Sequence, residues 1–199
     1  MTLDSAPSIV VVGGPNGAGK TIPAPFLLRD ALGVREYVNA DPIAAGLSAF
    51  APESVAIAAG RVMLARVEEL ARQRISFGFE TTLASRSFAP WLRLRLADGY
   101  AVHLVFLWLA SAELALARVA QRVELGGHSV PDDVVRRRYA SGLRNFFELY
   151  RPIVTTWQVY DNSDLRGPRL IAMGEGDTTH VSQADVWVRI VRQWAGAHG

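Results

Sequence analysis

The sequence contains no cysteine, and only one of its 21 Lys and Arg residues, Lys20, is a lysine. Without cysteine the chain can form neither disulfides nor thiolate metal sites, and a reducing cytoplasm is the simplest location for it. No run of about 18 apolar residues is present, so no membrane span is expected. Residues 1–7 include Asp4 and no basic stretch before an apolar core, so no signal peptide is expected.

Positive charge is not concentrated either. The 21 Lys and Arg residues face 19 Asp and Glu residues, which leaves a net charge of +2, and arginine is interspersed with acid outside the run at 136–138. Nucleic acid binding requires a dense basic patch, so no nucleic acid partner is expected. The length of 199 residues, half of them hydrophobic, suits a single domain, 1–199, with one core.

The single lysine lies in a glycine-rich segment with the spacing G-x-x-x-x-G-K-[ST], made of Gly14, Pro15, Asn16, Gly17, Ala18, Gly19, Lys20 and Thr21. Glycines let successive backbone N–H groups turn toward phosphate oxygens, and a helix starting there adds the positive end of its dipole. Lys20 is expected to reach the β- and γ-phosphates, and the Thr21 hydroxyl to bind Mg²⁺. The segment therefore predicts ATP and Mg²⁺ as cofactors.

Strand and helix patterns alternate along the chain. Strands are predicted at 8–12, 36–39, 75–79, 101–109, 157–160 and, as an edge strand, 168–173. Helices are predicted at 20–32, 52–74, 88–97, 114–125, from 132 to 151, and 184–195; the Met and aliphatic stripe of 52–74 is assigned to the core. This order predicts an α/β fold: a doubly wound, mainly parallel sheet with helices on both faces.

Acids follow two of these strands. Asp41 comes after 36–39, and Glu80, with Thr82, comes after 75–79. The carboxyl ends of parallel strands meet at the edge of the sheet where the phosphate loop lies, so these groups are candidates for contacting substrate. Pro42 predicts a turn at Asp41, and a turn without function remains an alternative for both segments. No acid ends strand 101–109, which favours a small-molecule kinase over a mechanochemical ATPase.

Two helices rich in arginine flank the glycine loop at 126–131. Arg118 and Arg122 lie four residues apart on one helix face, and the second helix carries Arg137 and Arg138. Arginine binds phosphate oxygens in a bidentate manner and stabilises developing negative charge. The pattern predicts a lid at about residues 112–145 that closes over a transferring phosphoryl group. A solvated helix face is the alternative for each arginine.

Taken as an ordered set, these segments resemble the zeta toxin family of P-loop kinases. The matching stretches are 13–21, 39–42, 79–82, 107–109, 126–128 with 137–139, and 160–163. The resemblance implies ATP-dependent phosphorylation of a hydroxyl on UDP-N-acetylglucosamine or a similar nucleotide-sugar. It also implies an antitoxin protein, encoded elsewhere, as a possible partner.

The resemblance implies roles for individual residues as well. Asp41 would accept the proton of the attacking hydroxyl, and Glu80 and Thr82 would contact the substrate. Arg86 stands two positions beyond the place of an arginine that larger toxins have after this motif. The γ-phosphate clamp would be Arg122 with Arg137 or Arg138, while Asn162 would contact the adenine and Arg118 the nucleotide.

Two rival functions remain at this stage. In one, ATP binding orders the lid so that a protein partner can dock, with no transfer to a metabolite. In the other, the arginine run holds RNA ends for a polynucleotide kinase, a reading that the small net charge disfavours.

Overall fold

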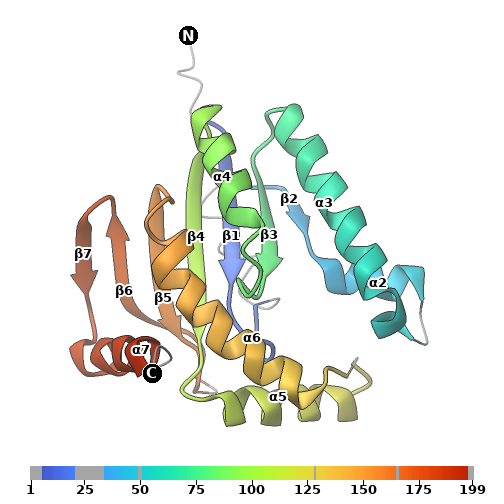
Figure 1. The fold of residues 1–199 in the computed structure, drawn as a ribbon, viewed down its shortest axis with the longest axis vertical. Helices are drawn as coiled ribbons and strands as arrows, with labels where there is room; N and C mark the ends of the chain where they lie inside the picture. Colours follow the sequence, from blue (N-terminus) through green and yellow to red (C-terminus); the bar gives the residue numbers. More distant parts are fainter. Residues whose placement is uncertain (1–5, 21–33, 49–50, 128, 165, 197–199) are drawn as a thin grey trace.

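The computed structural model describes residues 6–20, 34–48, 51–127, 129–164 and 166–196 (Figure 1). The helix predicted at 20–32 therefore lies outside the described residues, apart from Lys20. The predicted metal ligand Thr21 also lies outside them.

The described strands form one sheet in the order β2-β3-β1-β4-β5-β6-β7. Their bounds are β1 (Ser8–Gly13), β2 (Glu36–Val38), β3 (Phe77–Thr81), β4 (Ala101–Trp108), β5 (Thr156–Asp161), β6 (Arg169–Glu175) and β7 (Thr178–Val181). The pairs among β1 to β5 are parallel, and β6 and β7 are added antiparallel. The mainly parallel α/β sheet expected from the sequence is confirmed.

Two strand predictions need correction. The strand predicted at 75–79 begins at Phe77 and runs through Glu80 to Thr81, so the acid is part of the strand and not of a following turn. The strand predicted as the sheet edge, β6, is covered by β7, which was not predicted. All four residues of β7 are exposed, so no alternation of apolar and polar residues marks it in the sequence.

Helices pack on both faces of the sheet. The helical elements are α2 (Ala40–Leu47), the 3₁₀ turn η1 (Pro52–Val55), α3 (Ala56–Arg72), α4 (Phe88–Ala97), α5 (Ala112–Glu124), α6 (Asp132–Asn145), the π-helical turn η2 (Phe146–Tyr150) and α7 (Ala184–Gly196). Side chains of α3, α4, α7 and the end of α6 form the main core with Phe77 and Phe79. Ala115 and Val119 of α5 pack with Leu107, which points to the opposite face. In Figure 1, α5 lies beyond the carboxyl ends of the strands.

The turn predicted at Asp41 is wrong, because α2 begins at Ala40 and includes Asp41 and Pro42 in its first turn. The Asn39 side chain caps the helix by accepting the Asp41 N–H at 2.9 Å. A proline is tolerated there because the first backbone N–H groups of a helix have no acceptor within the helix. A residue that precedes proline usually avoids the helical conformation. Here the Asn39 cap, and the fact that no backbone N–H is needed at Pro42, outweigh that preference.

Helix α6 rests directly on the loop after β3. A Cβ atom at Gly142 would overlap the carbonyl oxygen of Thr82. Nearby, the buried Asn145 amide donates hydrogen bonds to the carbonyl oxygens of Leu83 at 2.7 Å and Ala84 at 3.1 Å. Leu83 has a left-handed backbone with φ of 57°, which is unfavourable without such support. The loop that carries Thr82 is therefore fixed to α6.

Replacing Gly142 by alanine tests this contact. We expect Gly142→Ala to lower the free energy of unfolding by about 1–3 kcal/mol, because α6 must move away from the loop or strain it. Gly60 of α3 is the matched control, since nothing lies within 4 Å of a Cβ placed there. Gly60→Ala should raise the free energy of unfolding by about 0.5–1 kcal/mol through helix propensity. Urea denaturation measures both, and equal stability of the two variants would contradict the contact.

Candidate functional site

The phosphate loop follows β1 and has the backbone that its glycines predict. Gly17 and Gly19 have φ of 76° and 74°, in the region where side chains are strained. Across the loop, the Lys20 ammonium donates hydrogen bonds to the carbonyl oxygens of Gly14 and Pro15, both at 3.0 Å. The loop thus forms a closed ring with the ammonium on one side. Such a ring presents backbone N–H groups to an anion.

Burial lowers the pKa of Lys20, whereas the nearby carboxylates of Glu80 and Asp41 raise it. The guanidinium groups of Arg122 and Arg138 lower it further. These groups come from the loop, β3, α2, α5 and α6, so elements far apart in the sequence bring their charges to one point. A bound polyphosphate would supply the negative charge that the buried ammonium and the two guanidinium groups favour.

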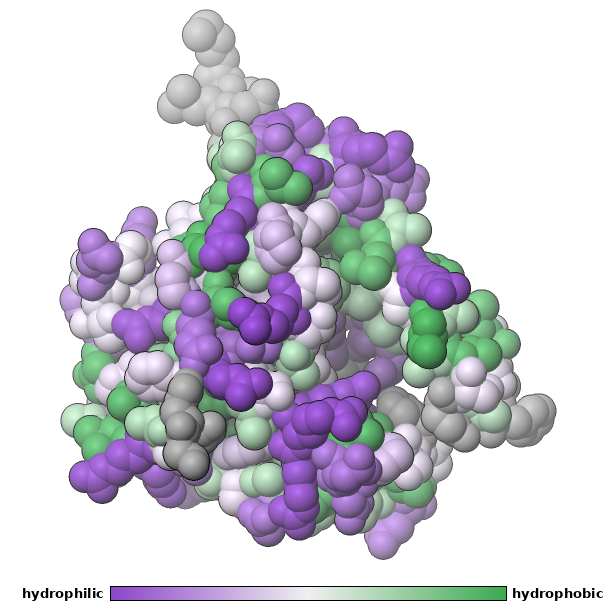
Figure 2. All heavy atoms as spheres, in the orientation of Figure 1, coloured by the Kyte–Doolittle hydropathy of each residue, from purple (hydrophilic) through white to green (hydrophobic). Residues whose placement is uncertain are grey.

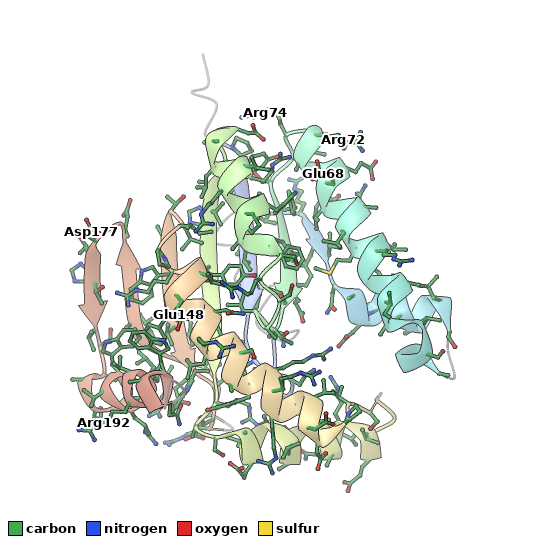
Figure 3. The ribbon with its side chains drawn as sticks, viewed as in Figure 1. Glu68, Arg72, Arg74, Glu148, Asp177 and Arg192 are labelled. Carbon is green, nitrogen blue, oxygen red and sulfur yellow. The ribbon has the colours of Figure 1, made fainter. Side chains whose placement is uncertain are left out.

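A cavity of about 430 Å³ lies at the carboxyl end of the sheet, next to the loop. Its lining includes Lys20, Asp41, Glu80, Thr82 and Arg138. Figure 2 shows a hollow between the arm formed by α2 and α3 and the rest of the molecule. Figure 3 shows Glu68, Arg72 and Arg74 at the other end of the sheet. The predicted donor and acceptor groups therefore meet in one cavity.

The predicted base lies at the mouth of this cavity. The Asp41 side chain is 56% exposed, and its Oδ2 lies 3.9 Å from Nη1 of Arg122. Asp41 belongs to α2 and Arg122 to α5, so the ion pair links the predicted lid to the arm.

The structure distinguishes the two arginines that the sequence left as alternatives. Arg138 lines the cavity, and its Nη1 lies 3.4 Å from Oδ1 of Asn16 in the phosphate loop. Burial and the neighbouring Arg137 lower the pKa of Arg138, while Asp41 raises it. By contrast, Arg137 is exposed and lies 3.9 Å from Asp133 on the same helix. Of these two arginines, Arg138 lines the cavity and Arg137 does not.

Two residues predicted to contact the nucleotide are instead bonded to the protein beside the loop. Arg118 donates hydrogen bonds to the carbonyl oxygens of Asn162 at 2.7 Å and Ser163 at 3.0 Å. The Asn162 amide donates to the carbonyl oxygen of Ala18 at 2.8 Å. Together they hold the segment after β5 against the phosphate loop, and their contact with ATP stays a prediction.

Arg86, predicted to bind substrate, does not join the site. It is exposed in the segment between β3 and α4 and is not among the residues that line the cavity. The displaced position of this arginine in the sequence is consistent with its place outside the cavity.

Part of the cavity wall is apolar, and the sequence did not indicate these lining side chains. Ala59 and Met63 of α3 are buried and line the cavity. Val130 and Val134 of the predicted lid also line it. The helical spacing of Ala59 and Met63 correctly placed them on an apolar face. Periodicity cannot show that part of such a face borders a cavity. No signal in the sequence therefore distinguished a core residue from one that lines the cavity.

The donor set fits a magnesium nucleotide. Asn16 and Lys20 of the phosphate loop and Arg138 of α6 line the cavity where phosphates would lie, and Mg²⁺ in such sites is held largely by phosphates and water. Within the described residues, no group of three or more His, Asp or Glu side chains could hold a metal ion on its own. Across the same residues, no helix is long and apolar enough to cross a membrane.

Several known proteins are similar to this chain. A protein of Haemophilus influenzae, described only as uncharacterized, is 32% identical over 126 residues, which make up 63% of this chain and 88% of that protein. Among solved structures, the AvrRxo1-ORF1:AvrRxo1-ORF2 complex with sulphate ions has a TM-score of 0.74 at 17% identity and covers 94% of this chain. The match covers 64% of that longer chain, and the same complex has been solved with ATP.

The PezAT chromosomal toxin-antitoxin system of Streptococcus pneumoniae is also similar, with a TM-score of 0.64 at 16% identity over 98% of this chain and 87% of that chain. At these identities the solved structures support the fold alone. The sequence itself decides the family, because the family model described as Zeta toxin matches residues 1–166. The chain therefore belongs to the zeta toxin family of P-loop kinases.

Proposed function

We propose that this protein is an ATP-dependent kinase that transfers the γ-phosphoryl group to a hydroxyl of a small molecule. Its acceptor is a nucleotide-sugar of the UDP-N-acetylglucosamine type, as the family resemblance implies. The observation that carries the proposal is the single cavity shared by Lys20, Asp41 and Arg138. Charge stabilisation of the phosphoryl group and a base for the acceptor are the two requirements of this reaction.

On the donor side, the loop N–H groups bind the phosphates of ATP. Lys20 exchanges the carbonyl oxygens of Gly14 and Pro15 for phosphate oxygens, which are stronger acceptors because they carry charge. Arg138 approaches from α6, and Arg122 is close enough to Asp41 to reach the phosphoryl group under attack. Mg²⁺, with Thr21 as its predicted protein ligand, would neutralise charge between the β- and γ-phosphates.

On the acceptor side, Glu80 and Thr82 accept hydrogen bonds from hydroxyls of the substrate and turn one hydroxyl toward Asp41. The Asp41 carboxylate takes the proton as the hydroxyl oxygen attacks phosphorus. The capped first turn of α2 fixes the backbone of Asp41, and its side chain lines the cavity.

The family and its toxin-antitoxin relative support a protein partner too. We infer that an antitoxin encoded elsewhere blocks this cavity, and that the protein acts in the cytoplasm, where ATP and nucleotide-sugars are present. Residues 112–145, which contain α5 and α6, are the moving lid of a single domain, 1–199.

Transfer itself is tested by mass spectrometry. The protein is incubated with Mg-ATP and either UDP-N-acetylglucosamine or a bacterial metabolite extract, and the products are compared with a Lys20→Ala control. We expect one UDP-sugar to gain a phosphoryl group with the wild type and not with the control. If a different metabolite is phosphorylated, the proposed reaction stands and the acceptor must be reassigned. No phosphorylated product, or labelled RNA ends only, would refute the proposal.

The role of Asp41 predicts a loss of turnover without a loss of nucleotide binding. Asp41→Asn should lower kcat by about 10²- to 10⁴-fold, because the amide cannot take the proton. Its dissociation constant for ATP, measured by calorimetry, should stay close to that of the wild type. Asp133→Asn, at an exposed acid of α6, serves as the matched control and should keep full turnover. Full activity of Asp41→Asn would exclude it as the base.

The different positions of Arg138 and Arg137 predict different effects of the same substitution. Arg138→Gln should lower kcat by about 10²- to 10³-fold, since it removes a donor to the transferring group. Arg137→Gln should change kcat by less than about fivefold, because its partner Asp133 is on the surface. Steady-state kinetics with both variants checks the difference, and a larger loss with Arg137→Gln would reverse the assignment.

A further inference from the structure

Tyr37 of β2 and Glu80 of β3 point to the same face of the sheet. Tyr37 is opposite Gly78 in the parallel register, and Glu80 is two residues further along β3. Side chains alternate along a strand, so positions 37, 78 and 80 share one face. Because Gly78 has no side chain, position 78 places no side chain between the phenol of Tyr37 and the carboxylate of Glu80.

Each of the two side chains has a buried oxygen without a completed hydrogen bond. Within the described part of the chain, Tyr37 Oη and Glu80 Oε1 are shielded from solvent and complete no hydrogen bond. Glu80 is only 9% exposed. Burial, the charge of the nearby Glu80 carboxylate and an incomplete hydrogen bond to that carboxylate raise the pKa of Tyr37, so its hydroxyl keeps its proton. A neutral donor therefore stands beside a carboxylate acceptor without a completed hydrogen bond, and native proteins retain few such groups without a reason.

The cavity separates the roles of the two residues. Glu80 lines it, whereas Tyr37 is not among its lining residues and packs instead with Val10 and Val12. Tyr37 thus stands behind Glu80, where it can act on a substrate only through the carboxylate. A carboxylate has two oxygens and can accept from the phenol and from a substrate hydroxyl at once.

We propose that Tyr37 is a positioning residue for the phosphoryl acceptor. When a bound acceptor reorients the Glu80 carboxylate, the Tyr37 hydroxyl donates a hydrogen bond to the carboxylate and holds it in that orientation. This role rests on the proposed function, in which Glu80 holds the acceptor. It makes this hydrogen bond incomplete in the ligand-free protein and complete in the complex with acceptor.

Substitution by phenylalanine, which removes only the hydroxyl, is the direct test, with UDP-N-acetylglucosamine as the acceptor probe. Tyr37→Phe should raise KM for the acceptor by about 10- to 100-fold, as expected for losing a hydrogen bond to a charged group. Its KM for ATP should stay unchanged. The double variant Tyr37→Phe/Glu80→Gln should match Glu80→Gln alone, since Tyr37 acts through Glu80. An unchanged acceptor KM, or additive effects in the double variant, would overturn the role.

Stability of the ligand-free protein gives a second readout that needs no activity. Tyr37→Phe should leave Tm unchanged or raised, because its hydroxyl has no completed hydrogen bond to lose. The matched control is Tyr100→Phe, whose buried hydroxyl lies 3.2 Å from the carbonyl oxygens of both Ala71 and Ile75. That control should lower Tm and leave the acceptor KM unchanged. An equal fall in Tm for both variants would show Tyr37 to be structural, even if the wild type phosphorylates nothing and the proposed function fails.

Discussion

The buried ammonium of Lys20 is the constraint on which the site depends. A cation removed from water is unfavourable unless hydrogen bonds and negative charge surround it. Here the carbonyl oxygens of Gly14 and Pro15 supply the hydrogen bonds, and the carboxylates of Glu80 and Asp41 supply the charge. The same carboxylates line the cavity, so in the proposed reaction the protein balances its phosphate-binding cation with the groups that contact the acceptor.

Helix α6 connects the two halves of this site. Arg138 faces the phosphate loop from the middle of the helix, while Gly142 and Asn145, one and two turns further on, hold the loop after β3. A displacement of α6 would therefore move a donor-side cation and the backbone around Thr82 together. Binding of either substrate can in this way influence the position of the groups that contact the other, without a separate pathway between them.

Sequence patterns predicted most of the fold because each element carries its own periodicity; α4 at Phe88–Ala97 has the bounds expected from it. The misses involve partners that a local pattern cannot show. The cap from Asn39 changed the conformation at Asp41, and β7 has no buried face. Within the site, the choice between Arg137 and Arg138 depended on how α6 is rotated on the sheet. Tyr37 went unnoticed because its significance comes from Gly78, a residue of another strand.

The ion pair between Arg122 and Asp41 is a weak contact between α5 and α2. The two charged atoms lie 3.9 Å apart, and both side chains are partly exposed, at 36% and 56%. Solvent-exposed pairs of this kind contribute only about 0–1 kcal/mol, so this contact by itself cannot hold α5 against α2. A triphosphate offers Arg122 more charge and better geometry than one carboxylate does. Its binding would draw the arginine inward and leave Asp41 to the acceptor hydroxyl, so that closure and readiness of the base arise from the same exchange of partners.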